Sequence, residues 1–125
     1  MKASESTIAW ISTYYEAIDS LDFRRVAEFL HHDCVCIYPG GQVQRGSERI
    51  LKTMAGSLGA LARIRHDLRN VWEAAEQHEV IFELEVSYWR EDGQQIVRPG
   101  MGVFVVYDGK IREQRLVVDA RGVWD

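Results

Sequence analysis

Residues 80–88 read VIFELEVSY, and this stretch decides the fold class because its apolar side chains occupy every second position. Successive side chains of a strand point to opposite faces, so strict alternation predicts a β-strand with one buried face. The side chains expected on that face are Val80, Phe82, Leu84, Val86 and Tyr88.

The residues before this strand repeat the pattern. Charged residues alternate with a second set between 64 and 73, which is Ile64, His66, Leu68, Asn70 and Trp72. The alternation predicts a second strand whose His66 side chain points to the same covered face as its apolar neighbours.

Two tight-turn sequences follow, at 91–93 (EDG) and 108–109 (DG). They separate the first strand from two more, predicted at 96–107 and 111–119, and four consecutive strands of this kind indicate an antiparallel meander. The longest strand is interrupted by residues that predict a bulge or bend, which are Pro99, Gly100 and Gly102.

The first half of the chain predicts helices. Apolar residues recur at helical spacing over 8–21, 23–30 and 50–58, and Ser47 is expected to cap the third helix. A short strand is predicted at 34–38, ended by a Pro-Gly-Gly turn. Helices followed by a meander predict an α+β fold with the helices on one face of an antiparallel sheet.

Composition excludes several classes of function. A chain of 125 residues with 46% hydrophobic content indicates one globular domain over residues 1–125. The net charge of −4 argues against a nucleic-acid partner, and no apolar run reaches the ~18 residues that a membrane crossing needs. Cys34 and Cys36 are too few and too close for a disulfide framework, so we expect reduced thiols and a cytoplasmic protein.

Several short motifs recur in one order along the chain. They are Tyr14 in the first helix, Tyr38-Pro39-Gly40-Gly41 after the first strand, Gly46-Ser47, Pro99, Asp108-Gly109-Lys110-Ile111 and Val117-Val118-Asp119. Together they resemble the nuclear transport factor 2-like superfamily, especially its ketosteroid isomerases and SnoaL-like polyketide cyclases. The resemblance covers residues 7–119. It implies a cone-shaped fold whose curved sheet encloses a pocket, with no cofactor, and a homodimer that pairs through an outer sheet face bearing Trp89 and Phe104.

The resemblance also suggests catalytic residues. Tyr14 resembles the tyrosine that donates a hydrogen bond to an oxyanion in the isomerases, although a buried core tyrosine is the alternative. His66 lies on the strand where SnoaL-like proteins often carry a histidine, but a core histidine is an equal alternative. Asp119 resembles their terminal general acid or base, or it is simply a polar residue at a strand end.

Two positions depart from the isomerase pattern. Tyr38 stands where the isomerases keep the carboxylate base, and Met101 stands where they keep a protonated aspartic acid. A phenol is a poor base at neutral pH and a thioether cannot donate a hydrogen bond, so the chain is not expected to be an efficient ketosteroid isomerase. Tyr38 is expected to orient a ligand instead. The full set of expected substrate-binding residues is Trp10, Cys36, Tyr38, Phe82, Met101 and Leu116.

Other charged residues leave alternatives open. His31, His32 and Asp33 are metal-binding residue types, but adjacent histidines do not easily converge on one ion, so no metal is expected. Arg98 and Arg115 are expected either to pair with Asp119 or an anionic ligand, or to face solvent.

Two functions remain. One is a cofactor-free acid–base enzyme acting on a small, mostly apolar molecule such as a polyketide, steroid or terpenoid. The other is a non-catalytic protein that binds such a molecule. At least two titratable groups converging on one cavity would favour the enzyme.

Overall fold

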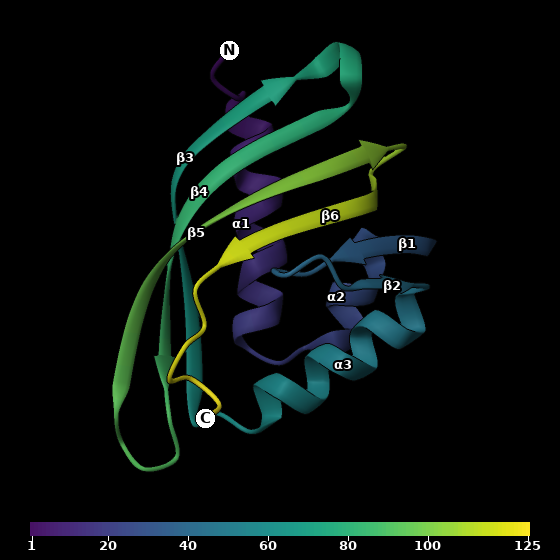
Figure 1. Cartoon of the computed structure of the whole chain (residues 1–125). Coiled ribbons are helices and arrows are strands. Elements are labelled where there is room, and N and C mark those ends of the chain that lie inside the picture. The colour runs from purple at the N-terminus through teal and green to yellow at the C-terminus, as the bar shows by residue number, and fades with distance from the viewer.

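The computed structural model describes residues 1–125 as helices packed on one curved sheet (Figure 1). The predicted α+β class is confirmed. The elements are α1 (Glu5–Asp19), α2 (Phe23–Phe29), β1 (Leu30–Ile37), β2 (Val43–Arg45), α3 (Ser47–Gly59), β3 (Arg63–Ala74), the 3-10 helix η1 (Ala75–Gln77), β4 (Glu79–Trp89), β5 (Gln95–Tyr107) and β6 (Lys110–Val118).

The six strands form one unclosed sheet in the order β2-β1-β6-β5-β4-β3. The strands β3 to β6 make the predicted antiparallel meander. However, β1 pairs in parallel with β6, so the sheet is mixed rather than wholly antiparallel. The first strand in the chain therefore lies beside the last, and this pairing brings residues near the N-terminal helices next to the C-terminal strand.

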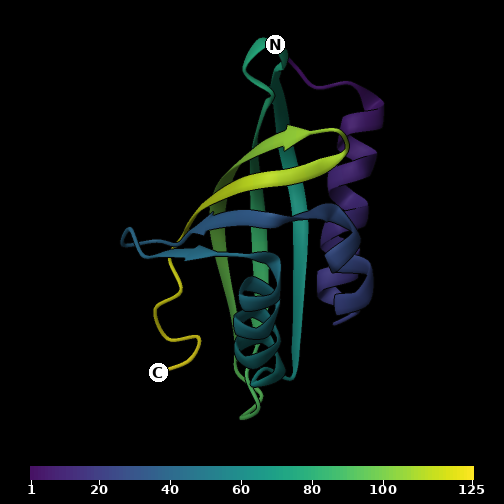
Figure 2. The same ribbon diagram turned by 90° about the vertical axis from the view of Figure 1, so that its right-hand side faces the viewer.

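The helices cover the concave face of the sheet. In Figure 2, α3 lies in front of the strands, and α1 runs along the side of the sheet that β3 forms. The helix α1 begins after Ser4, whose hydroxyl oxygen accepts a hydrogen bond from the Thr7 amide. None of the helices combines the length and apolar composition that a membrane crossing requires.

The start of α3 differs from the sequence-based expectation in one respect. Gly46, rather than Ser47, is the N-cap residue, and its φ of 94° lies in the left-handed region. A glycine adopts this conformation without steric cost, and because it has no side chain the cap makes no side-chain hydrogen bond.

The strand predictions fail at two places. In β3 the register shifts between Leu68 and Asn70, so the buried residue beyond the shift is Val71 rather than Trp72. In β5 no bulge interrupts pairing with β4 at Pro99, where one was predicted. Its irregularity lies between Val105 and Val106, opposite β6.

Aromatic side chains fill the core between α1 and the sheet. Tyr14, Phe82 and Phe104 are among the largest fully buried side chains. The ring of Tyr14 meets that of Phe104 edge to face, with centroids 5.5 Å apart. Phe104 is thus on the inner face, and its predicted place on the outer face is wrong. Only Trp89 of that pair points outward, with the Arg63 guanidinium 4.6 Å from its ring centroid.

Candidate functional site

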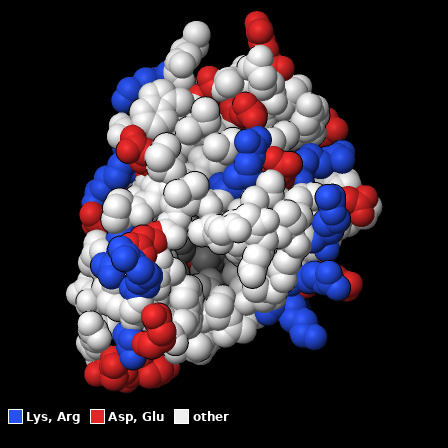
Figure 3. Space-filling model, in the orientation of Figure 1, with Lys and Arg blue, Asp and Glu red and all other residues white.

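An apolar cavity of about 210 Å³ lies between the concave face of the sheet, α1 and α3. Of its 22 lining residues, 17 are hydrophobic, so a ligand inside would lose most of its contact with water. In the space-filling view, uncharged atoms surround the hollow and charged side chains lie farther out (Figure 3).

Most residues predicted for the site border this one cavity. They come from α1, β1, β3, β4, β5 and β6, and they are Tyr14, Cys36, Tyr38, His66, Phe82, Met101 and Leu116. Residues far apart in sequence, such as Cys36 and Leu116, thus contribute to the same surface, because β1 lies against β6.

His66 is held in place by Asp19, at the end of α1. The two side chains approach to 2.5 Å between Nδ1 and Oδ1, and the other carboxylate oxygen accepts a hydrogen bond of 2.8 Å from the His66 amide. Tyr15 stacks on the imidazole with ring centroids 4.5 Å apart. Only 12% of the His66 side chain and 19% of the Asp19 side chain are exposed. The carboxylate therefore fixes Nδ1 as the donor and leaves Nε2 without a partner in the chain.

Asp19 is the residue that sequence analysis missed. It falls on the polar side of the first helix, where a solvated carboxylate is the ordinary expectation. The relevant signal is three-dimensional: α1 ends beside β3, so that residue 19 meets residue 66.

Tyr14 lies deep in the cavity and donates a hydrogen bond of 3.1 Å from its hydroxyl to Oε1 of Gln114. Burial raises the pKa of Tyr14 far above its ordinary value, so the phenol stays protonated and remains a donor. Gln114 is itself buried on β6 and lines the cavity. Its amide group also lies beside the Cys36 thiol, which pairs with it across β1 and β6, and its nitrogen can donate to a ligand oxygen.

Tyr38 borders the cavity from the end of β1. Its hydroxyl donates to Oε1 of Gln44 at 2.7 Å, and the amide nitrogen of Gln44 donates to the hydroxyl of Thr53 on α3 at 2.7 Å. This chain of hydrogen bonds joins two walls of the cavity. Burial raises the pKa of Tyr38 above its usual range, so the phenol stays protonated at neutral pH.

The position of Phe82 on the sheet requires a glycine at residue 102 of β5. Gly102 pairs with Phe82 across the strands, and a Cβ built on it would lie 2.4 Å from the ring. The absence of a side chain at Gly102 thus lets Phe82 lie flat on the sheet. Met101 borders the cavity, but its strand neighbours Glu83 and Val117 belong to the outer face, and its side chain is largely exposed.

Two predicted residues lie elsewhere. Asp119 does not border the cavity and does not approach His66; its carboxylate binds the guanidinium of Arg121 at 2.7 Å. These hydrogen bonds lower the pKa of Asp119 to about 2. Asp119 follows β6, which ends at Val118, and its carboxylate is occupied by Arg121 instead of facing His66. Trp10 packs on Phe29 and faces a second, more open hollow near the N-terminus of α1.

A wall that sequence analysis did not anticipate is formed by the C-terminal tail, residues 119–125. Its Trp124 lines the cavity and donates from the indole nitrogen to the carbonyl oxygen of Ser57 on α3 at 2.8 Å. Trp124 also meets Tyr88 edge to face. In Figure 1 the tail is the yellow segment that leaves β6 and descends between the sheet and α3.

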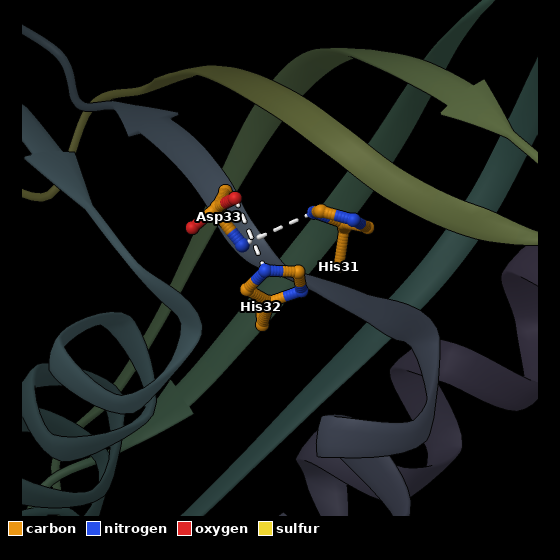
Figure 4. Close-up of side chains that lie close together, drawn as sticks. All are labelled: His31, His32 and Asp33. Carbon is orange, nitrogen blue, oxygen red and sulfur yellow. Dashed lines mark hydrogen bonds and ion pairs between the residues drawn. The ribbon is translucent and has the colours of Figure 1, made fainter.

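The histidine pair of β1 lies outside the cavity. His31, His32 and Asp33 bring ligand atoms within 4.8 Å of one another (Figure 4). The Asp33 amide donates to Nδ1 of His31, and His32 contacts the Asp33 carboxylate at 3.1 Å. The nearby cations Arg112 and Lys110 oppose a bound metal ion, so the cluster is a poor candidate metal centre.

The family model of the SnoaL-like domain matches residues 11–114, and the chain belongs to that family. A putative SnoaL-like polyketide cyclase from Jannaschia sp. CCS1 shares 16% identity at a TM-score of 0.79, over 95% of this chain and 91% of that one. IdmH, a putative polyketide cyclase from Streptomyces antibioticus, shares 17% sequence identity at a TM-score of 0.79, over 92% of this chain and 93% of that one.

A third solved structure has a different chemistry in its name. An LEH-like epoxide hydrolase from M. tuberculosis shares 20% identity at a TM-score of 0.78, over 94% of this chain and 85% of that one. No curated protein sequence matches this chain significantly. Likeness at these identities shows a common fold, the nuclear transport factor 2-like fold predicted from the motifs.

Proposed function

We propose that this protein is a cofactor-free acid–base enzyme whose cavity binds a small, mostly apolar molecule of the polyketide, steroid or terpenoid type. The observation that carries the proposal is the His66–Asp19 pair at the edge of a largely apolar cavity. An imidazole whose Nδ1 is held by a carboxylate presents Nε2 as a base, and the carboxylate stabilises the imidazolium that forms. His66 is the catalytic residue of this proposal and Asp19 its positioning residue.

Proton abstraction next to a carbonyl produces an enolate, and its oxygen needs hydrogen-bond donors. The Gln114 amide supplies one donor deep in the cavity, and Tyr14 supplies a second when its hydroxyl turns from Oε1 of Gln114 to the ligand. Tyr38 orients the ligand from the wall opposite. Polyketide cyclisation, isomerisation and dehydration all begin with such a proton transfer, and the presence of SnoaL-like polyketide cyclases among the structural relatives supports this reaction class.

A test needs an enolisable apolar ketone, and 2-tetralone is a suitable probe. We expect the protein to accelerate solvent deuterium exchange at its α-carbons, followed by proton NMR. The His66→Asn variant should fall to the background rate, while His78→Asn, which alters a histidine of the second hollow, should retain activity. Equal exchange by the wild type and His66→Asn would contradict the proposal.

The second candidate is a protein that binds an apolar ligand without chemistry. It is supported by the 17 hydrophobic residues of the lining and by the position of Asp119 away from the cavity. Saturable binding of 2-tetralone without any exchange above background would favour this candidate over the enzyme.

We also propose a homodimer that pairs through the outer face of the sheet. Val97, Met101 and Val117 form an apolar strip there, and Val117 is 67% exposed. A two-fold axis through this face would bury the strip of each copy against that of the other. Light scattering should give twice the mass of the chain, and Val117→Lys should give the monomer.

The buried free thiols of Cys34 and Cys36 support a reducing, cytoplasmic location.

A further inference from the structure

Arg98 is a positive charge without an acidic partner on the inner face of the sheet. It pairs across the strands with Val86, which lines the cavity, so its side chain leaves the sheet on the cavity side. Its terminal nitrogens donate to the carbonyl oxygens of Val97 and Arg121, at 3.3 and 3.1 Å. Its Nε is shielded from solvent and has no hydrogen-bond partner.

An unpaired buried donor on a charged group is costly, and a native protein retains one where a ligand or a functional contact uses it. Another arginine of these strands shows the usual solution. Arg115 lies on the outer face and binds the carboxylates of Glu79 and Glu113 at 3.1 and 2.7 Å. Arg98 lacks any such neighbour: Asp119 is the nearest carboxylate on the tail, and Arg121 occupies it.

Tyr88 stands beside Arg98 on the same face. It lines the cavity, and no group of the chain hydrogen-bonds its hydroxyl. Tyr88 pairs with Ile96 and Arg98 pairs with Val86, so the two side chains are diagonal neighbours on one face of the sheet. Burial raises the pKa of Tyr88 to about 12, and the charge of Arg98 opposes that rise. At neutral pH the phenol is protonated and can donate a hydrogen bond. An unpartnered cation and an unpartnered donor are thus neighbours on the inner face, where Tyr88 lines the cavity beside Trp124.

We propose that Arg98 and Tyr88 form an anion subsite, and that the ligand of this protein is an apolar molecule carrying a carboxylate at the end opposite its reactive carbon. The inference rests on the proposed function, since it names the class of molecule that the same cavity takes. A charge-assisted hydrogen bond to Arg98 and a second from Tyr88 would hold the carboxylate. The apolar body would then lie across Val86, which pairs with Arg98 on one side and with His66 on the other.

The test compares an anion with a neutral molecule of the same shape. Binding of 2-naphthoate and of 2-naphthamide is measured by isothermal titration calorimetry at neutral pH. We expect the wild type to bind naphthoate at least about tenfold more tightly, in line with the strength of charge-assisted hydrogen bonds. Equal affinities, or no measurable binding of naphthoate, would overturn the subsite.

Substitutions can distinguish whether Arg98 contacts the ligand or only holds the C-terminal tail. Arg98→Gln should abolish the preference for naphthoate and leave naphthamide unchanged, whereas Arg98→Lys should keep most of it and Tyr88→Phe should reduce it. Arg90→Gln is the matched control, because Arg90 also binds the tail, at the carbonyl oxygens of Gly122 and Asp125. If Arg90→Gln reduced naphthoate binding as much as Arg98→Gln, Arg98 would only anchor the tail and the subsite would be overturned.

The subsite and the proposed reaction fail separately. His66→Asn should retain the full preference for naphthoate, although it should lose deuterium exchange into 2-tetralone. A preference that persists in a protein without exchange activity supports the subsite and contradicts only the enzyme. Exchange activity without a preference for the anion supports the enzyme and contradicts only the subsite.

Discussion

The chain contains two histidine–aspartate pairs that share their chemistry and differ in their surroundings. His66 and Asp19 approach to 2.5 Å with 12% and 19% of their side chains exposed. His32 and Asp33 approach to 3.1 Å with 77% of each exposed. Water weakens the second pair and competes for both partners, whereas the first pair is fixed by its environment.

The two pairs also differ in what supports them. Asp19 is 47 residues from His66 in sequence, and its second oxygen is held by the His66 amide. Tyr15 covers the imidazole. Asp33 follows His32 directly, and the contact orders nothing beyond the strand itself. The comparison indicates that a functional pair is defined by preorganisation, not by residue type.

The largest expected difference is in catalysis. Asp19→Asn should lower the rate of deuterium exchange into 2-tetralone by about two to four orders of magnitude, because the amide no longer fixes the imidazole tautomer or stabilises the imidazolium. Asp33→Asn should leave the rate unchanged. Both rates are measured by proton NMR on proteins whose folding has been checked by circular dichroism.

An Asp19→Asn variant that kept its activity would make His66 an ordinary core histidine and break the comparison. If Asp19→Asn and His66→Asn each abolished the activity and the double variant lost no more than either, the two residues would act as one unit.

His66 was within reach of the sequence because its phase in an alternating strand is a local property. The same is true of the fold, since periodicity and turn residues determine which segments are helices and which are strands. Asp19 was out of reach, because its partner depends on how far α1 runs before it meets β3. The parallel pairing of β1 with β6 was hidden for the same reason: it is a contact between distant segments that no local pattern encodes.

The alternation of residues along a strand no longer tells which face a side chain occupies once the strand contains an irregularity. The shift after Leu68 exchanged the faces of Val71 and Trp72, and sequence offers no mark for it. The glycines of β5 had the opposite effect. They resembled a bulge, yet the pairing with β4 is regular and Gly102 simply makes room for Phe82. Phe104 was assigned to the wrong face because the pairing register of β5 with β4 cannot be determined from the sequence.

A smaller difference is expected in stability. Asp19→Ala should lower the free energy of unfolding by about 1–3 kcal/mol, because it leaves the half-buried His66 amide and imidazole without their acceptor. Asp33→Ala should change it by no more than about 0.5 kcal/mol, as is usual for an exposed pair. Urea denaturation followed by tryptophan fluorescence measures both. Equal losses in the two variants would remove the distinction between the pairs.

The exposed cluster should respond only weakly to metal. Because Arg112 and Lys110 add positive charge beside His31, zinc should raise the midpoint of thermal unfolding by less than about 1 °C at a modest excess over protein. His32→Asn is the control for specific coordination. A large rise that this variant abolishes would show that His31, His32 and Asp33 form a metal site after all.

The smallest effect concerns the protonation of His31. Partial burial, and then the charge of Arg112, hold the pKa of His31 below its ordinary value. The neutral imidazole is therefore favoured in the folded protein, and the group resists protonation as the pH falls through the range in which a free histidine gains its charge. Arg112→Gln should raise the pKa of His31 toward the ordinary value, while the same substitution at Arg24, on α2, should leave it unchanged. A titration followed by the imidazole carbon-bound protons in NMR resolves the two cases. If Arg112→Gln left the His31 pKa where it was, the charge of Arg112 would not reach the cluster, and the electrostatic reason for its weak affinity for metal would fail.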